Sequence, residues 1–283
     1  MNNTNHQAIP PSSREGLGVG LTIIKVGGAV VEDELQLSSL LRDFIAINGP
    51  KILVHGGGRR ATKVASQLGI ESKMVNGRRI TDSHMLEVVT MVYGGLVNKN
   101  IVARLQALGI NALGLTGADM DIIRSHKRPP VVSSQDSSSP CLLDFGFVGD
   151  VDRADGQRLN LLLEAGITPV IAPLTHDGKG QILNTNADTM AGETAKGLAP
   201  YYDVTLIFAF EKPGVLTDPN DDNSVIPLLT REIYNKYVAE GVISGGMMPK
   251  IENAFAALEA GVARVIITRA DAIDGCHGTV IQK

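Results

Sequence analysis

The sequence contains no tryptophan, and only 4% of its 283 residues are aromatic. Its core must therefore be aliphatic, with alanine and glycine where elements approach each other closely. Two cysteines, Cys141 and Cys276, cannot form a disulfide framework, and neither belongs to a CxxC pair. No apolar run reaches the roughly 18 residues that a membrane-spanning helix needs, so we expect no membrane association.

The charge balance also lacks the basic excess that is typical of nucleic-acid-binding domains. There are 26 basic and 30 acidic residues, which give a formal net charge of −4. With 43% hydrophobic and 20% charged residues, the chain is expected to be globular. Residues 1–18 lack the basic start and apolar core of a signal peptide, so we expect a flexible tail on a cytoplasmic protein.

Short apolar runs alternate with amphipathic segments along the rest of the chain. This alternation predicts an α/β protein with a mostly parallel central sheet. At roughly 150 residues per domain the length suggests two lobes, which we divide into 19–186 and 187–283. Residues 121–149 look irregular and would suit hairpins and a loop over a site. Strands are predicted at 21–26, 51–54, 110–115, 168–172, 182–183, 204–210, 263–268 and 279–282, and helices at 34–47, 58–68, 82–108, 157–164, 187–198, 231–240 and 249–260.

Glycines are predicted where strands meet helices at three places, Gly27-Gly28, Gly56-Gly57-Gly58 and Gly245-Gly246. One such turn would be explained by tight geometry alone. Three of them favour a phosphate site, because glycine lets backbone N–H groups approach an anion at the carboxyl ends of parallel strands. The chain has no GxxxxGK[ST] and no GxGxxG after a strand, which argues against a P-loop and against a dinucleotide fold.

Two lysines lie beside these glycines. Lys25 interrupts an apolar strand and shares a face with Leu21 and Ile23; the alternative is an edge-strand lysine that reaches water. Lys250 follows Pro249, in the first turn of a predicted helix, where the helix dipole disfavours a cation unless an anion binds there. The alternative for Lys250 is a solvated surface lysine.

Three further polar residues are candidates for the same site. Asp188 begins a predicted helix and could hold both lysines in place, or could simply be an N-cap or first-turn acid of that helix. Arg79 could clamp a carboxylate with two hydrogen bonds, whereas a surface role is favoured for its neighbour Arg78. Asn184 could donate to and accept from the same substrate.

In order along the chain, these pieces resemble the amino-acid kinase family from about residue 20 to the end. Any one piece is weak, but the ordered set is specific. The matching pieces are KVGG (25–28), VHGGG (54–58), NGRRIT (76–81), NTNAD (184–188) and GGMMPK (245–250).

The resemblance implies a role for each catalytic candidate. Lys25 and Lys250 would stabilise a migrating phosphoryl group, and Asp188 would organise the two lysines. The backbone N–H groups of Gly28 and Gly57 would donate to that phosphoryl group.

The resemblance also implies a substrate and a fold. Gly57 and Gly58 would line an acyl-amino-acid site, and Arg79 and Asn184 would hold the α-carboxylate side of the substrate. The implied activity is ATP-dependent phosphorylation of the side-chain carboxylate of N-acetyl-L-glutamate, a step of arginine biosynthesis, with Mg²⁺ accompanying ATP. The implied fold is an open αβα sandwich with an N-terminal acceptor and dimerisation lobe and a C-terminal nucleotide lobe, and residues 82–108 would form a homodimer.

Some features depart from the family pattern. Residues 210–214 (FEKPG) replace a segment that often carries Asp-Val, and relatives with this variant are associated with N-succinyl-L-glutamate as acceptor. A succinyl group would need an extra cation, for which Lys127, Arg128 and Arg124 are candidates, although ordinary solvated charges are the favoured interpretation. The acidic run 218–224 is expected to be a solvated loop, with no protein metal site. Two other classes stay open, a nucleotide-binding oxidoreductase and a non-catalytic amino-acid sensor.

Overall fold

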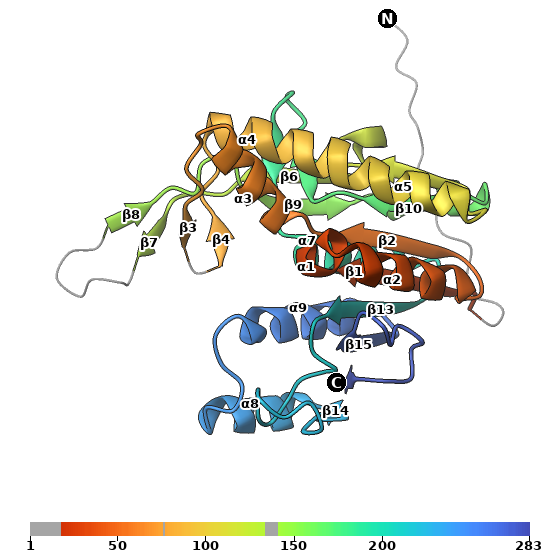
Figure 1. Ribbon diagram of the computed structural model, residues 1–283. Coiled ribbons are helices and arrows are strands. Elements are labelled where there is room, and N and C mark those ends of the chain that lie inside the picture. The colour runs from red at the N-terminus through yellow and green to blue at the C-terminus, as the bar shows by residue number, and fades with distance from the viewer. Residues whose placement is uncertain (1–17, 76, 134–140) are drawn as a thin grey trace, which may run out of the picture.

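The computed structural model describes residues 18–75, 77–133 and 141–283 (Figure 1). Almost all of the predicted tail, 1–18, and most of the polar stretch 133–140 lie outside the described residues. Within the described ranges, no helix combines the length and apolar character that a bilayer crossing requires.

An eight-stranded, mostly parallel sheet forms the centre of the molecule, as the alternating pattern predicts. Its strands from β15 to β5 in spatial order are parallel, while β16 and β14 run in the opposite direction. In spatial order the strands are β14 (Leu228–Leu229), β16 (Thr279–Ile281), β15 (Arg264–Arg269), β13 (Asp203–Phe210), β1 (Gly20–Val26), β2 (Lys51–His55), β10 (Thr168–Ile171) and β5 (Ala112–Leu115).

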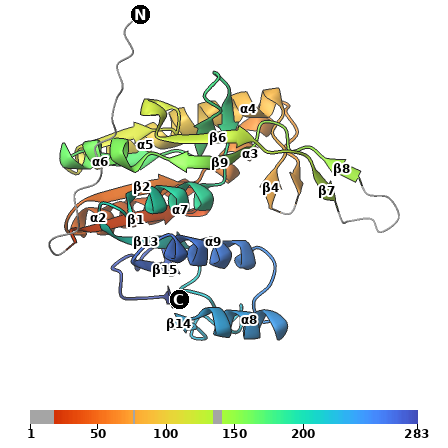
Figure 2. The same ribbon diagram turned by 180° about the vertical axis from the view of Figure 1, so that it is seen from behind.

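Helices cover both faces of this sheet, and two aliphatic clusters fill the space between the layers. Leu21 and Ile23 of β1 belong to one cluster, and Ile24 and Val26 to the other, so the strand is buried on both faces. Figure 1 shows α1 and α2 in front of the sheet, and Figure 2, which views the molecule from behind, shows α6, α7 and α9 on the opposite face. The first face carries α1 (Gly28–Glu32), α2 (Glu34–Ala46), α3 (Gly58–Gln67), α4 (Ser83–Val89) and α5 (Asn98–Ala107), and the second carries α6 (Gly156–Glu164), α7 (Ala187–Leu198), α8 (Arg231–Ala239) and α9 (Met247–Glu259).

A second, four-stranded sheet and two small hairpins form separately from the central sheet. The irregular segment 121–149 contains hairpin strands, as predicted, but β9 and β11 within the second sheet were not predicted. The four strands are β12 (Ile182–Asn184), β11 (Leu174–His176), β6 (Ile123–Lys127) and β9 (Gly149–Ala154), and the hairpins pair β3 (Met74–Val75) with β4 (Arg78–Arg79) and β7 (Val131–Ser133) with β8 (Cys141–Leu143). A short 3₁₀ turn, η2 (Asp119–Asp121), precedes β6.

The predicted helix 82–108 is helical throughout, but its middle is not an α-helix. Between α4 and α5 lies a π-helical segment, η1 (Thr90–Val97), that contains Gly94 and Gly95. A π-turn closes i→i+5 hydrogen bonds and holds one more residue than an α-turn, a geometry that often marks functional sites.

One sequence expectation about glycine is wrong. Gly245 and Gly246 follow α8 and precede α9, so they join two helices and do not end a strand. Gly245 has φ +57°, a left-handed conformation that suits glycine in such a turn. Helix α9 begins at Met247, which makes Pro249 its third residue and keeps Lys250 in the first turn.

Candidate active site

Two adjoining cavities open at the carboxyl ends of β1 and β2. The larger has a volume of about 530 Å³ and the smaller about 200 Å³. Gly58, Met74 and Arg79 line both of them, so these residues form the wall between the cavities. This position, outside the carboxyl edge of a parallel sheet, is where open α/β proteins bind ligands.

Lys25 is buried beside an aspartate. Its strand lies between β13 and β2, so the edge-strand alternative is wrong. Only 6% of the residue is exposed, and its Nζ lies 2.7 Å from Asp188 Oδ1. Because the flanking strand residues Leu21 and Ile23 face the α7 side of the sheet, the period of two also carries Lys25 to that side.

Asp188 is free to make this contact because another residue caps its helix. The side chain of Asn186 accepts hydrogen bonds from the backbone N–H groups of Asp188, at 2.8 Å, and Thr189, at 3.1 Å. The N-cap alternative for Asp188 is therefore wrong, and its carboxylate, in the first turn of α7, turns towards Lys25.

Lys250 approaches the same point from α9. Lys25, Lys250 and Phe210 all line the larger cavity. The ring centroid is 3.7 Å from Lys250 Nζ and 4.6 Å from Lys25 Nζ, within the range of cation–π attraction. Burial lowers the pKa of Lys250 from its usual 10.5; attraction by Asp188 opposes this shift, and repulsion by Lys25 adds to it.

The two glycine turns approach each other through their backbones. A Cβ on Gly28 would lie 3.4 Å from the nitrogens of both Gly57 and Gly58, and a Cβ on Gly56 would lie 3.0 Å from Gly28 N. Gly28 and Gly58 begin helices, where first-turn N–H groups have no partner within the helix. The sequence placed these glycines at one site, and the structure brings them together.

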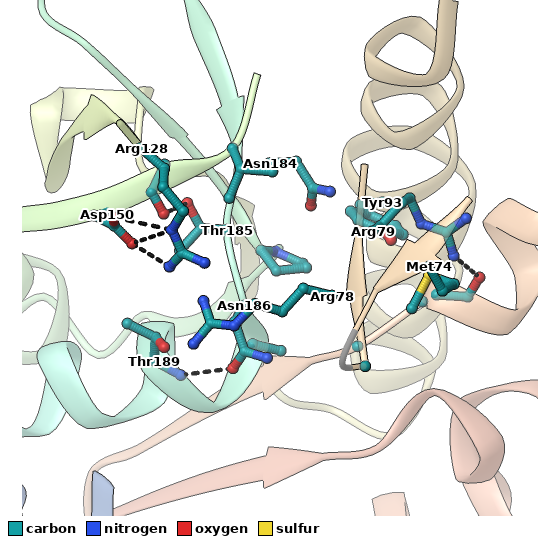
Figure 3. A pocket seen from close by; sticks show the side chains of 18 residues that line it. Met74, Arg78, Arg79, Tyr93, Arg128, Asp150, Asn184, Thr185, Asn186 and Thr189 are labelled. Carbon is teal, nitrogen blue, oxygen red and sulfur yellow. Dashed lines mark hydrogen bonds and ion pairs between the residues drawn. The ribbon is translucent and has the colours of Figure 1, made fainter. Parts of the chain in front are cut away.

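Arg79 is also buried, but its guanidinium is already engaged by the protein. Its Nη2 donates to Gly58 O and to Thr62 Oγ1, both at 2.9 Å, and its Nη1 donates to Ser72 Oγ. In this conformation Arg79 braces the wall between the cavities instead of presenting a free fork. Arg78, as predicted, is exposed, although it lines the smaller cavity (Figure 3).

Asn184 reaches the smaller cavity from β12. Its Nδ2 donates to Thr81 Oγ1 at 2.9 Å, which fixes the amide and turns its oxygen towards the cavity side (Figure 3). The bond links the second sheet to the segment that follows Arg79, two regions more than a hundred residues apart.

Of the three cations that were candidates for binding a succinyl group, Arg128 lines a cavity. Arg128 Nε lies 3.1 and 3.0 Å from the two carboxylate oxygens of Asp150, and both residues line the smaller cavity (Figure 3). Hydrogen bonding from Arg128 holds the pKa of Asp150 below its usual value. Lys127 instead pairs with Asp144 at 3.4 Å, and Arg124 pairs with Asp121 at 2.7 Å.

Sequence reasoning missed Tyr93 and Phe210. A Cβ on Gly57 would lie 2.7 Å from Tyr93 Cδ1, so the tyrosine ring forms the floor beneath the glycine turn. Its position depends on the π-turn, for which the sequence carries no periodic signal. Phe210 could have been found, because it ends the strand next to β1, on the face shared by Phe208, the register partner of Lys25.

Buried cations, glycine N–H groups without an acceptor among the described residues and two adjoining cavities are features typical of a protein that binds an anion. The comparisons with known proteins agree: the model of the amino acid kinase family matches residues 20–269, and the chain belongs to this family. The chain is 64% identical to an acetylglutamate kinase of Phocaeicola vulgatus over 93% of this chain and 98% of that one. It is 61% identical to an acetylglutamate kinase of Bacteroides fragilis, over 95% and 100% of the two chains. Among solved structures it resembles smu.665 of Streptococcus mutans, with a TM-score of 0.73 and 27% identity over 93% and 98% of the two chains.

Proposed function

We propose that the protein is an acetylglutamate kinase, which uses ATP to phosphorylate the side-chain carboxylate of N-acetyl-L-glutamate. The names of the high-identity relatives support this activity. The observation that carries the proposal is the convergence of Lys25 and Lys250 on one cavity that adjoins a second, smaller one. The larger cavity would hold the ATP phosphates, and the smaller one would hold the acceptor, with Gly58 and Arg79 between them.

The proposed reaction needs no general base. A carboxylate oxygen of the acceptor attacks the γ-phosphorus, the bond from that phosphorus to the β–γ bridging oxygen breaks, and ADP leaves with the electron pair. No proton moves, so catalysis consists of alignment and of stabilising the charge on the transferred group. Lys25 and Lys250 would supply positive charge, Asp188 would fix Lys25, and Gly28 and Gly57 would donate backbone hydrogen bonds.

The carboxylates at the site do not form a cage for a metal ion. Within the ranges that the structure describes, no three His, Cys, Asp or Glu side chains are grouped as metal ligands. Asp188 is engaged by Lys25, and Glu211, at the larger cavity, pairs with Arg59 at 3.0 Å. This arrangement fits Mg²⁺ that arrives on the ATP phosphates and keeps most of its water.

Two further proposals concern the state of the protein. Met91 and Leu96 of η1 are 55% and 48% exposed, which supports a homodimer formed through the helix of residues 82–108. We also propose a cytoplasmic location, where ATP and amino-acid intermediates are available. Light scattering coupled to size exclusion would test the dimer.

The decisive experiment measures ADP release with N-acetyl-L-glutamate and with N-succinyl-L-glutamate side by side. We expect the acetyl substrate to have the higher kcat/KM. Because Arg128, which follows β6, is paired with Asp150, its guanidinium is not free to bind a second carboxylate in the smaller cavity. A higher kcat/KM with the succinyl substrate would overturn the acyl assignment, and turnover of neither would overturn the kinase assignment.

A further inference from the structure

A buried histidine lies directly behind the glycine turn. His55 ends β2, immediately before Gly56, and its side chain is fully buried. Both ring nitrogens have partners: Nδ1 lies 2.9 Å from Gly56 O, and Nε2 lies 3.1 Å from Asn98 Nδ2. The imidazole lines neither cavity, so it cannot touch a substrate held there.

Asn98 fixes the tautomer of this histidine. The Nδ2 of Asn98 also donates to Val170 O at 2.9 Å, which identifies that atom as the amide nitrogen because a carbonyl only accepts. The second hydrogen of Nδ2 is then donated to His55 Nε2. Burial lowers the pKa of His55 to about 4, so the ring is neutral and carries its one hydrogen on Nδ1. That hydrogen is donated to the Gly56 carbonyl.

The surrounding elements are shaped to hold Asn98 in place. The π-turn of η1 comes immediately before Asn98 and places Tyr93 beneath Gly57, so one irregular turn supports the glycine loop at two points. On the other side, a Cβ on Gly114 of β5 would lie 1.9 Å from Asn98 Oδ1. That oxygen is buried without a hydrogen-bond partner among the described residues. An unpaired buried oxygen lowers the stability of the fold, which indicates that Asn98 serves a role other than stability.

The Gly56 carbonyl and the Gly57 N–H belong to one planar trans peptide, so they point in opposite directions. Holding the carbonyl inward on His55 therefore aims the Gly57 N–H outward, at the cavity that Gly57 lines. Among the described residues, no protein acceptor takes this N–H. We propose that His55, held by Asn98, is a positioning residue that locks the Gly56–Gly57 peptide so that the Gly57 N–H faces the transferred phosphoryl group. This inference rests on the proposed kinase function.

The test compares two substitutions of the histidine. His55→Phe keeps the ring and removes the Nδ1–H donor, so the peptide is free to turn. We expect kcat to fall about 10²-fold or more, as when one oxyanion-hole donor is lost, while KM for both substrates stays within about threefold. His55→Gln restores an N–H donor to the site and should recover at least about tenfold of that loss.

Leu105→Ala is the matched control, because Leu105 is buried in the same helix α5 and lies two turns beyond Asn98. It should lower the melting temperature without changing kcat by more than about twofold. If His55→Phe lowers kcat no more than Leu105→Ala does, or raises KM alone, the inference is overturned. Should His55→Phe not fold, Asn98→Ala serves instead, with the same expected loss of kcat.

The tautomer of His55 can also be measured in the wild-type enzyme, without any variant. Nitrogen-15 NMR of the histidine rings should show His55 as the Nδ1–H tautomer, with no titration down to about pH 5. An Nε2–H tautomer, or titration near neutral pH, would overturn the inference. Absence of wild-type turnover with either acceptor would overturn the proposed function as well, whereas normal turnover with the wrong tautomer would overturn this inference alone.

Discussion

Replacing Lys25 by methionine separates the structural role of the buried ion pair from its catalytic role. Lys25 Nζ lies 2.7 Å from Asp188 Oδ1, and the two side chains are only 8% and 10% exposed. Lys25→Met keeps most of the side-chain volume but leaves the aspartate without its nearest cation. The substitution should therefore reduce both the stability of the fold and the rate of phosphoryl transfer, for different physical reasons.

The loss of stability follows from the unpaired carboxylate. Removing one partner of a buried ion pair costs about 3–5 kcal/mol. The lower end applies here, because Lys250 still attracts Asp188 and the larger cavity admits water. At about 2–4 °C per kcal/mol for a chain of this size, 3 kcal/mol corresponds to a fall in melting temperature of about 6–12 °C.

The loss of rate follows from the missing charge at the transferred group. Removal of one preorganised donor from an oxyanion site costs about 10²–10³-fold in kcat, and we expect the upper end because the group lost is a full cation. KM for ATP should change much less, because the interaction is strongest when charge spreads over the equatorial oxygens. Coupled ADP-release kinetics and thermal unfolding of the same preparation measure both effects.

The double variant Lys25→Met/Asp188→Asn identifies the cause. With the carboxylate also gone, no charge is left buried and unpaired, so most of the lost melting temperature should return while kcat stays low. If the double variant is as unstable as Lys25→Met, the ion pair is not the source of the instability. A Lys25→Met enzyme with kcat within about threefold of the wild type would remove Lys25 from the mechanism.

Three other changes test neighbouring parts of the site. Arg79→Lys should raise KM for the acceptor about tenfold or more and leave KM for ATP nearly unchanged. The reason is that a single ammonium cannot bond Gly58 O and Thr62 Oγ1 as the guanidinium does. A change confined to KM for ATP would contradict the assignment of the cavities. Lys250 must be protonated to act, and burial lowers its pKa, so kcat/KM should fall with rising pH at a midpoint below 10.5. The Lys250→Arg variant should be slower, and its fall in kcat/KM should move to a pH above the measurable range, because arginine keeps its proton. Phe210→Leu should lower kcat about 2- to 30-fold, equal to about 0.5–2 kcal/mol of cation–π attraction, whereas Phe210→Tyr should stay close to wild type in steady-state assays.

The strand pattern was sufficient to place Lys25. A run with apolar residues on both faces predicts a strand inside the sheet, and the period of two assigns Lys25 to the face on which α7 packs. The side chain of Asn186 was not recognised as the cap of α7, although an Asn directly before an apolar-periodic helix is a common signal. That signal would have freed the carboxylate of Asp188 for another role.

The irregular parts of the backbone could not be predicted from the sequence. A π-turn has no hydrophobic period of its own, so the contacts of Tyr93 and Asn98 with the glycine turn were not foreseen. Gly245 was read as the end of a strand because glycine signals a left-handed turn without saying which elements the turn joins.

The arrangement of the cations implies that the two lysines affect stability with opposite sign. Lys25 has a carboxylate at 2.7 Å, whereas burial is the largest influence on Lys250 and lowers its pKa in spite of the attraction by Asp188. A lowered pKa means that the folded state disfavours the ammonium relative to the unfolded chain, so near neutral pH its charge costs stability. Lys250→Met should therefore leave the melting temperature of the ligand-free protein unchanged or raise it, while kcat falls about 10²–10³-fold. A fall in melting temperature as large as that of Lys25→Met would show that Lys250 is held by the fold and not kept there for the substrate.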